Sequence, residues 1–75
     1  MKIIEIINQI ESDKKERNIY PHYALVFEVI QIAYKHFPAG PVEIVKQELE
    51  ELQKQGVIKL GQTVNDNYIT ILKAI

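Results

Sequence analysis

Apolar residues recur at helical spacing along most of the chain and at alternate positions near its end. At the start, the isoleucines Ile3, Ile6, Ile7 and Ile10 fall within an arc of about 100° on a helical wheel. This pattern predicts a first amphipathic helix over residues 2–15. Ile4 lies off the stripe, and we expect it to be either a residue at the edge of the core or a dimer contact.

A second helix is predicted from His22 to Phe37, because apolar residues cover all but a narrow polar stripe of this segment. A helix this apolar should be buried on most of its sides. Pro21 stands near its start, where proline is tolerated. Since proline pushes the preceding residue toward extended conformations, Tyr20 should not be helical, and residues 18–20 would form a short strand.

A third helix is predicted to run from Pro41 to about residue 55, after a turn rich in proline and glycine at residues 38–41. Its core stripe recurs at helical spacing, and Gly56 ends the helix because glycine tolerates the left-handed conformation of a helix end. Alternating apolar residues then predict two strands, at residues 57–60 and 68–72. The segment 61–67 between them contains turn-forming residues. The residues of the core stripe are Val45, Leu49 and Leu52.

Composition places the chain among small globular proteins. Its 75 residues predict a single α+β domain over residues 1–75, and its 47% hydrophobic content is enough for a core. The chain contains no cysteine, which excludes disulfides and thiolate chemistry and fits a cytoplasmic protein. No apolar run approaches the length of a membrane span, and the first residues lack the pattern of a signal peptide.

The usual constellations of catalytic or metal-binding residues are missing from the sequence. The two histidines, His22 and His36, lack the spacing of a metal-binding pair, and nothing near Ser12 marks it as a nucleophile. Glu50 and Glu51 are adjacent on a helix and therefore point in different directions. We expect no enzymatic activity, no cofactor and no bound metal.

The order of a helix, a short strand, two helices and a hairpin resembles the winged helix-turn-helix superfamily. The segment LEELQKQGVIKL, residues 49–60, is similar to the end of a recognition helix that runs into the first strand of a wing. Val45, Leu49 and Leu52 match the core-facing positions of that helix. The resemblance covers residues 3–72 and implies a small winged helix of three helices and a C-terminal β-hairpin, with residues 18–20 as a third strand.

The resemblance also implies binding of double-stranded DNA, because the third helix of this superfamily usually enters the major groove while the wing touches the backbone or minor groove. By position, Gln47 would read adenine and Lys46 would reach a phosphate or a guanine. Such a protein would be a regulator or an accessory factor and would act as a dimer. The DNA-binding residues implied in this way are Lys46, Gln47, Glu50, Lys54, Gln62, Thr63, Asn65 and Asn67.

Charge favours a different function. Residues 40–56 contain four glutamates and two lysines, and the whole chain has a net charge of -1. Because contacts to phosphates supply most non-specific affinity for DNA, a negative reading helix is a handicap. The alternative is a winged-helix module that binds a protein partner and no DNA. Its contact residues would be Ile4, Ile44, Glu48 and Glu51.

Overall fold

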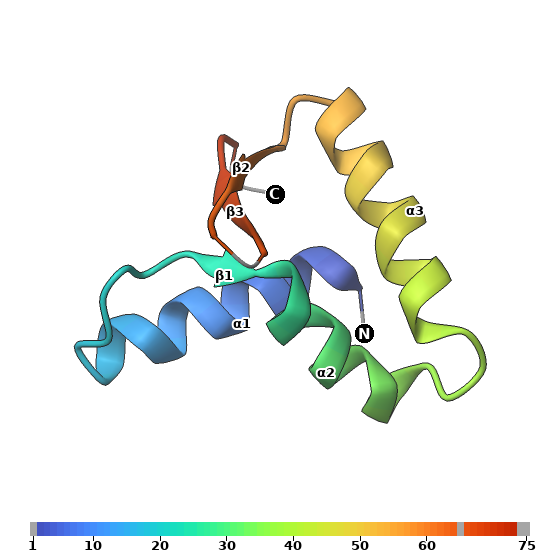
Figure 1. Cartoon of the computed structure of the whole chain (residues 1–75), viewed down its shortest axis with the longest axis horizontal. Coiled ribbons are helices and arrows are strands. Elements are labelled where there is room, and N and C mark those ends of the chain that lie inside the picture. The colour runs from blue at the N-terminus through green and yellow to red at the C-terminus, as the bar shows by residue number, and fades with distance from the viewer. Residues whose placement is uncertain (1, 65, 74–75) are drawn as a thin grey trace.

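Three helices and a three-stranded antiparallel sheet make up the protein, as seen in a computed structural model that describes residues 2–64 and 66–73 (Figure 1). The sheet has the strand order β1-β3-β2. The α+β class predicted from the sequence is therefore confirmed. The elements are α1 (Ile3–Glu16), β1 (Ala24–Leu25), α2 (Val26–His36), α3 (Pro41–Lys54), β2 (Ile58–Gln62) and β3 (Asn67–Ile71).

The core lies between the three helices and the inner face of the sheet. Helix α1 contributes five isoleucines, of which Ile6 and Ile7 are completely buried. Ile4 was expected either at the edge of the core or in a dimer contact. The structure places it in the core, since this side chain is only 9% exposed. Burial of an isoleucine contributes roughly 1.5–3 kcal/mol, so this cluster is a main source of stability. The other fully buried residues include Val29, Ala33, Val45 and Ile69.

Helix α2 starts four residues later than the sequence predicts, at Val26 rather than His22. The preceding pair, Ala24 and Leu25, forms β1 and pairs with β3, where Ala24 lies opposite Ile69. The backbone N–H of Leu25 then donates to the Glu28 carboxylate at 2.9 Å, which caps the first turn. The strand predicted at residues 18–20 was therefore wrong, because the chain joins the sheet only after Pro21.

Burial of α2 is also less complete than predicted. Only Val29 and Ala33 are fully buried on this helix, while Phe27 and Tyr34 are 56% and 58% exposed. Helix α1 packs against one flank of α2 and α3 against another, and the remaining side faces solvent. A domain with only three helices cannot cover a helix on every side, however apolar its sequence is.

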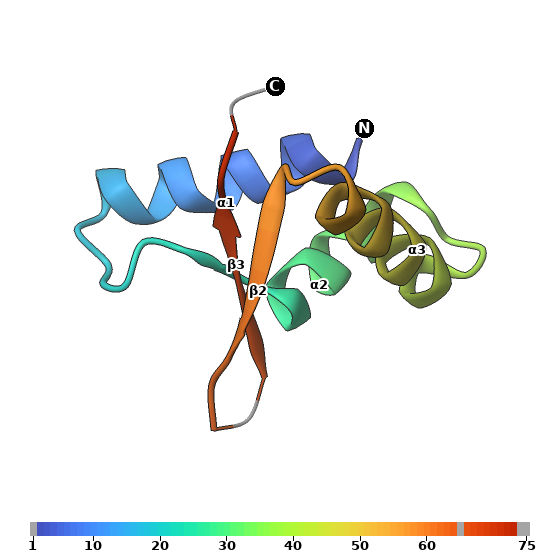
Figure 2. The ribbon, with the colours of Figure 1, turned by 90° about the horizontal axis from the view of Figure 1, so that it is seen from above.

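The β2–β3 hairpin follows α3 directly and extends away from the helices, as Figure 2 shows. Gly56 adopts the left-handed conformation with φ 73°, and the N–H of Val57 donates to the Leu52 carbonyl at 2.9 Å. This hydrogen bond closes the end of α3, and β2 begins two residues after Gly56. The third helix, the glycine stop and the hairpin predicted from the sequence are all confirmed.

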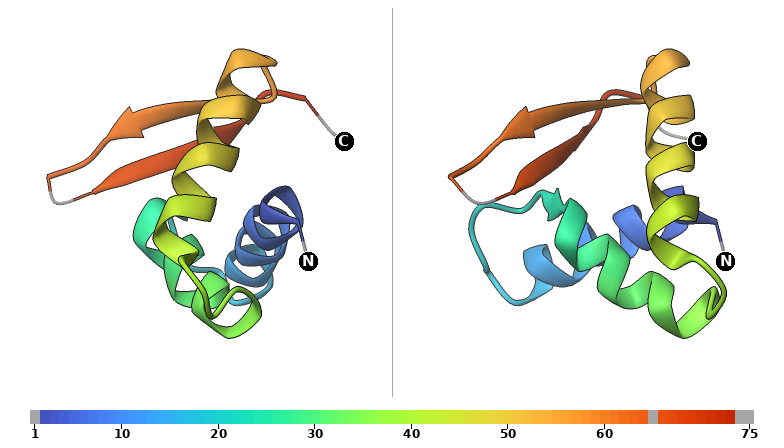
Figure 3. Two further views of the ribbon diagram at one scale, coloured as in Figure 1. Left: turned by 90° about the vertical axis from the view of Figure 1, so that its right-hand side faces the viewer. Right: turned by 45° about the vertical axis from the view of Figure 1, so that its right-hand side comes forward.

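Helix α3 lies beside the hairpin, and the start of α1 lies next to α3 (Figure 3). The inner face of the hairpin continues past the core, because Ile58 and Leu60 face the helices while Gln62 lies farther along the same strand. Within residues 2–64 and 66–73, no helix is long and apolar enough to span a membrane.

Candidate nucleic-acid interface

Helix α3 has a buried face and a wide polar face. Pro41 occupies its first position after Gly40, and its buried residues are those of the predicted core stripe together with Pro41 itself. The polar side chains on the opposite face have no helix or strand over them. Each of the predicted residues on this face is exposed, namely Glu43, Lys46, Gln47, Glu50 and Lys54.

The structure brings residues of α3 and the hairpin together in one groove. Lys46 and Glu50 of α3 and Asn67 of β3 line a groove of about 250 Å³, whose floor is apolar. Gln62 lies directly opposite Asn67 in the strand register, and so belongs to the same face of the hairpin. Four of the eight predicted DNA-binding residues thus come from two neighbouring elements around this groove.

The remaining predicted residues have different surroundings. Gln47 is exposed farther round α3, and Lys54 lines a shallow depression of about 330 Å³ with Glu50 at the end of the helix. Thr63 shapes the turn, since its hydroxyl donates to the Asp66 carbonyl at 2.7 Å and accepts from the Asp66 N–H at 2.9 Å. Asn65 lies outside the described residues.

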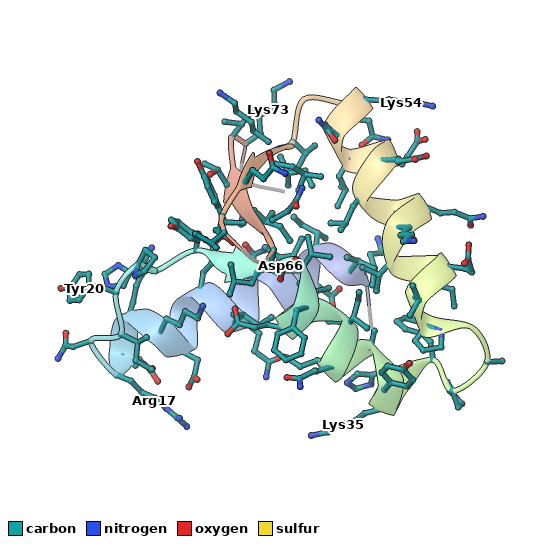
Figure 4. The ribbon with its side chains drawn as sticks, in the orientation of Figure 1. Arg17, Tyr20, Lys35, Lys54, Asp66 and Lys73 are labelled. Carbon is teal, nitrogen blue, oxygen red and sulfur yellow. The ribbon has the colours of Figure 1, made fainter. Side chains whose placement is uncertain are left out.

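Asp66 connects the hairpin to α2. Its carboxylate accepts a hydrogen bond from the backbone N–H of Phe27 at 2.9 Å, across 39 positions of the sequence. Figure 4 shows Asp66 between the hairpin and the first turn of α2. An acidic side chain is stabilised at this position because the N-terminus of a helix is partly positive. The Asp66 carboxylate therefore caps the N-terminus of α2.

The negative charge of α3 is unevenly distributed around the helix. Its polar face carries Lys46 and Lys54 with Glu43 and Glu50, so two positive charges balance two negative ones. The excess of -2 comes from Glu48 and Glu51. Glu48 lines a pocket of about 270 Å³ together with Ile4 at the start of α1. Glu51 stays on the exposed face, because it lies one turn from Gln47 and Lys54. The handicap predicted from the summed charge of the helix is therefore only partly reduced on the face that points away from the core.

The residues named for a protein partner are divided between the surface and the core. Glu48 and Glu51 are exposed, and the Glu51 carboxylate accepts a hydrogen bond from the Gln55 side chain at 3.4 Å. Ile4 belongs to the core, and Ile44 is half-buried against it. Ile44 therefore packs against the core and is not a free apolar contact residue.

A further lysine, Lys73, lies beside Gly56, just past the end of α3. Lys54 and Lys73 extend outward at the end of the molecule where α3 passes into β2 (Figure 4). Among the described residues, the ion pairs are Lys14–Glu28 and Arg17–Asp13, so Lys46, Lys54 and Lys73 are in none. The proximity of Lys73 follows from the return of β3 beside β2, which no local pattern indicates.

Other chemistry is sparse in the part of the chain that the structure covers. No group of three histidine, aspartate or glutamate side chains there could hold a metal ion. The rings of Tyr20 and His22 lie 4.3 Å apart, between their centroids, in the segment before β1. Comparison with known proteins gives no further guidance, since no family model, curated protein or solved structure matches the chain.

Proposed function

We propose that the protein is a small winged-helix DNA-binding protein, in which α3 enters the major groove and the β2–β3 hairpin is the wing. The order α1-β1-α2-α3-β2-β3 and the strand order β1-β3-β2 support this proposal, since both are typical of winged helix-turn-helix domains. The observation on which it depends is the groove that polar side chains of α3 share with the inner face of the hairpin.

Particular side chains would make particular contacts. Gln47, on the exposed face of α3, can donate to and accept from the major-groove edge of adenine, and Lys46 can reach a guanine or a phosphate. Lys54 at the end of the helix would contact a phosphate. Gln62 and Asn67 of the wing carry amides that suit sugar and phosphate oxygens in the adjacent backbone.

Binding by one protomer should be weak. The exposed face of α3 carries a small excess of negative charge, and the chain has a net charge of -1, so long-range attraction to DNA is small. Two copies on neighbouring half-sites would double the number of phosphate contacts and compensate for this weakness. The proposal therefore includes a dimer as the form that binds DNA.

Single lysine substitutions test this proposal by fluorescence anisotropy on a labelled duplex of mixed sequence at low salt. Lys46→Ala and Lys54→Ala should each weaken binding, whereas Lys15→Ala should not, because Lys15 is exposed on α1 away from α3. If the wild-type chain shows no binding at low salt, or if Lys15→Ala weakens binding as much as the α3 substitutions, the proposal is wrong.

A substitution of Gln47 separates base recognition from backbone contact. Gln47→Ala should reduce discrimination between the best duplex and its mismatched forms, at a cost of about 1–3 kcal/mol per lost base contact. Binding to non-specific duplex should remain unchanged, because the net charge of the protein is unchanged. Equal losses on all duplexes would show that α3 does not read base edges.

The alternative of a protein-binding module has in its favour a pocket of about 270 Å³, lined in part by Ile4 and Glu48. The two apolar residues of this alternative, Ile4 and Ile44, pack into or against the core, and a partner on that flank would meet mainly Glu48 and Glu51. Charged side chains are depleted from the centres of protein interfaces. We therefore place the DNA-binding function first.

A further inference from the structure

Aromatic side chains form an exposed stripe on α2 that the proposed DNA-binding function does not use. Phe27 and Tyr34 are seven residues apart, which places them within about 20° of each other on the helix. They are 56% and 58% exposed, and Ile30 lies between them and is half-buried. The stripe is therefore an apolar surface that no other element covers among the described residues.

The stripe continues into an apolar groove beside the wing. Phe27 and Leu25 line one side of a groove of about 600 Å³, and Val64 and Thr63 of the hairpin turn line the other, with Asp66 between them. Val64 is 97% exposed. The β2–β3 hairpin projects past α2 in Figure 2.

We propose that this surface binds a second copy of the chain, with α2 of one protomer packed antiparallel on α2 of its partner about a two-fold axis. An isologous contact of this kind requires a surface that is complementary to itself. When the axis passes between residues 30 and 31, Phe27 of each protomer lies opposite the partner's Tyr34. The partner's Tyr34 ring then enters the groove between Phe27 and Val64.

Charge along α2 has the complementarity that this arrangement needs. Glu28 and Lys35 are also seven residues apart, on the flank next to the aromatic stripe. In an antiparallel two-fold pair, the same flanks of both helices lie on one side, so the partner's Lys35 approaches Glu28. Parallel packing would instead put the charged flanks of the two helices on opposite sides and lose this pairing, and antiparallel helices also align their dipoles favourably.

The Glu28 carboxylate can accept this additional partner. It already accepts hydrogen bonds from Lys14 at 2.7 Å and from the Leu25 N–H at 2.9 Å, and both fall on the same oxygen, Oε1. Within the described residues, its other oxygen accepts no hydrogen bond, and Lys35 is in no ion pair. The side chain of Glu28 is 29% exposed, so the free oxygen is accessible from outside.

The area of the stripe predicts a weak dimer. An aromatic side chain buries about 150–250 Å² in total, and roughly half of each ring is accessible here, so four rings offer on the order of 300–500 Å². Stable interfaces bury about 1,200–2,000 Å². The wing residues and the flank of α2 add area, but the dimer should still dissociate on dilution. This inference concerns the free protein and does not depend on DNA binding.

Sedimentation velocity over a range of concentrations tests the dimer. The wild-type chain should shift from monomer to dimer as its concentration rises. Phe27→Ser and Tyr34→Ser should each raise the dissociation constant at least about 100-fold, because each removes two rings from a two-fold interface. Leu72→Ser is the matched control, since Leu72 is 55% exposed and lies outside the stripe.

The outcomes of this experiment are distinct. A chain that stays monomeric at millimolar concentration overturns the proposal, and so does a dimer that persists in both serine variants. Circular dichroism checks that the variants are folded, which is expected because the substituted rings are exposed. Lys35→Glu gives an independent test, since it should weaken the dimer by placing a second negative charge beside Glu28 in both symmetry-related contacts.

Disulfide cross-linking tests the antiparallel register and leaves α2 intact in both protomers. The chain has no cysteine, so Phe27→Cys and Tyr34→Cys each introduce a single thiol. A mixture of the two variants should oxidise to the mixed disulfide much faster than either alone, because like positions lie about 10 Å apart along the antiparallel helices. Equal rates for the mixture and the separate variants would contradict this register.

Discussion

Replacing Asp66 tests how the β2–β3 hairpin is attached to the helices. In Asp66→Ala, the backbone N–H of Phe27 loses the carboxylate that accepts it at 2.9 Å. The loss of an N-terminal cap costs about 0.5–2 kcal/mol, and the loss of a negative charge at this end of a helix is part of that cost. For a domain of this size, a loss of about 1 kcal/mol lowers the melting temperature by about 4–8 °C.

Two further variants separate the components of this effect. Asp66→Asn keeps an acceptor oxygen but removes the charge, so it should lose only about 0.3–1 kcal/mol. Asp13→Ala is the control, because Asp13 makes only an exposed ion pair with Arg17, and such pairs contribute little. The hydrogen bonds between Thr63 and the backbone of Asp66 are present in every variant and keep the turn intact.

Urea unfolding followed by circular dichroism gives the free energies, and amide hydrogen exchange locates the change. The N–H of Phe27 should exchange slowly in the wild-type protein and faster in Asp66→Ala, while amides in the middle of α1 should change only with global stability. An unchanged free energy of unfolding together with unchanged exchange at Phe27 would refute the role given to Asp66.

Three other substitutions have defined outcomes. Gly61→Ala should destabilise the hairpin by about 1–3 kcal/mol in urea unfolding, because a Cβ atom at residue 61 would collide with the ring of Tyr68. Lys14→Met should cost about 1–3 kcal/mol because it removes partly buried hydrogen bonds to the Tyr23 carbonyl and the Glu28 carboxylate, whereas Arg17→Met should stay within about 0.5 kcal/mol. Burial raises the pKa of Glu11, so folding favours its protonated form. As the pH rises from below 4.5 through the folded pKa, the wild-type chain should lose stability relative to Glu11→Gln, and parallel unfolding curves would contradict this.

Local patterns were sufficient for the elements whose two faces differ clearly. The bounds of helices α1 and α3 were predicted to within a residue or two, because their apolar stripes are narrow and Gly56 marks the end of α3. The hairpin followed from alternation of apolar residues. In α2 the pattern was ambiguous, because residues 22–25 are apolar enough for either a helix or a strand. Pairing of Ala24 with Ile69, 45 positions away, decided between them.

The sequence predicts which side chains of α3 are exposed, but not the electrostatics around them. Exposure of Lys46 and Gln47 follows from helical periodicity. The sequence does not show that Glu48 faces the start of α1, or that Asp66 caps α2, because both depend on contacts between distant segments. The exposed face of α2 was missed for the same reason, since hydrophobicity alone does not show which sides of a helix its neighbours cover.

A titration of duplex DNA at two salt concentrations tests the central claim most directly. If Lys46 and Lys54 of one or two protomers contact phosphates, two to four counterions are released on binding. The dissociation constant should then rise about 10-fold to 150-fold between 50 mM and 200 mM salt. No measurable binding at the lower salt concentration, or binding that is unchanged between the two, would contradict a DNA-binding function for α3 and the wing.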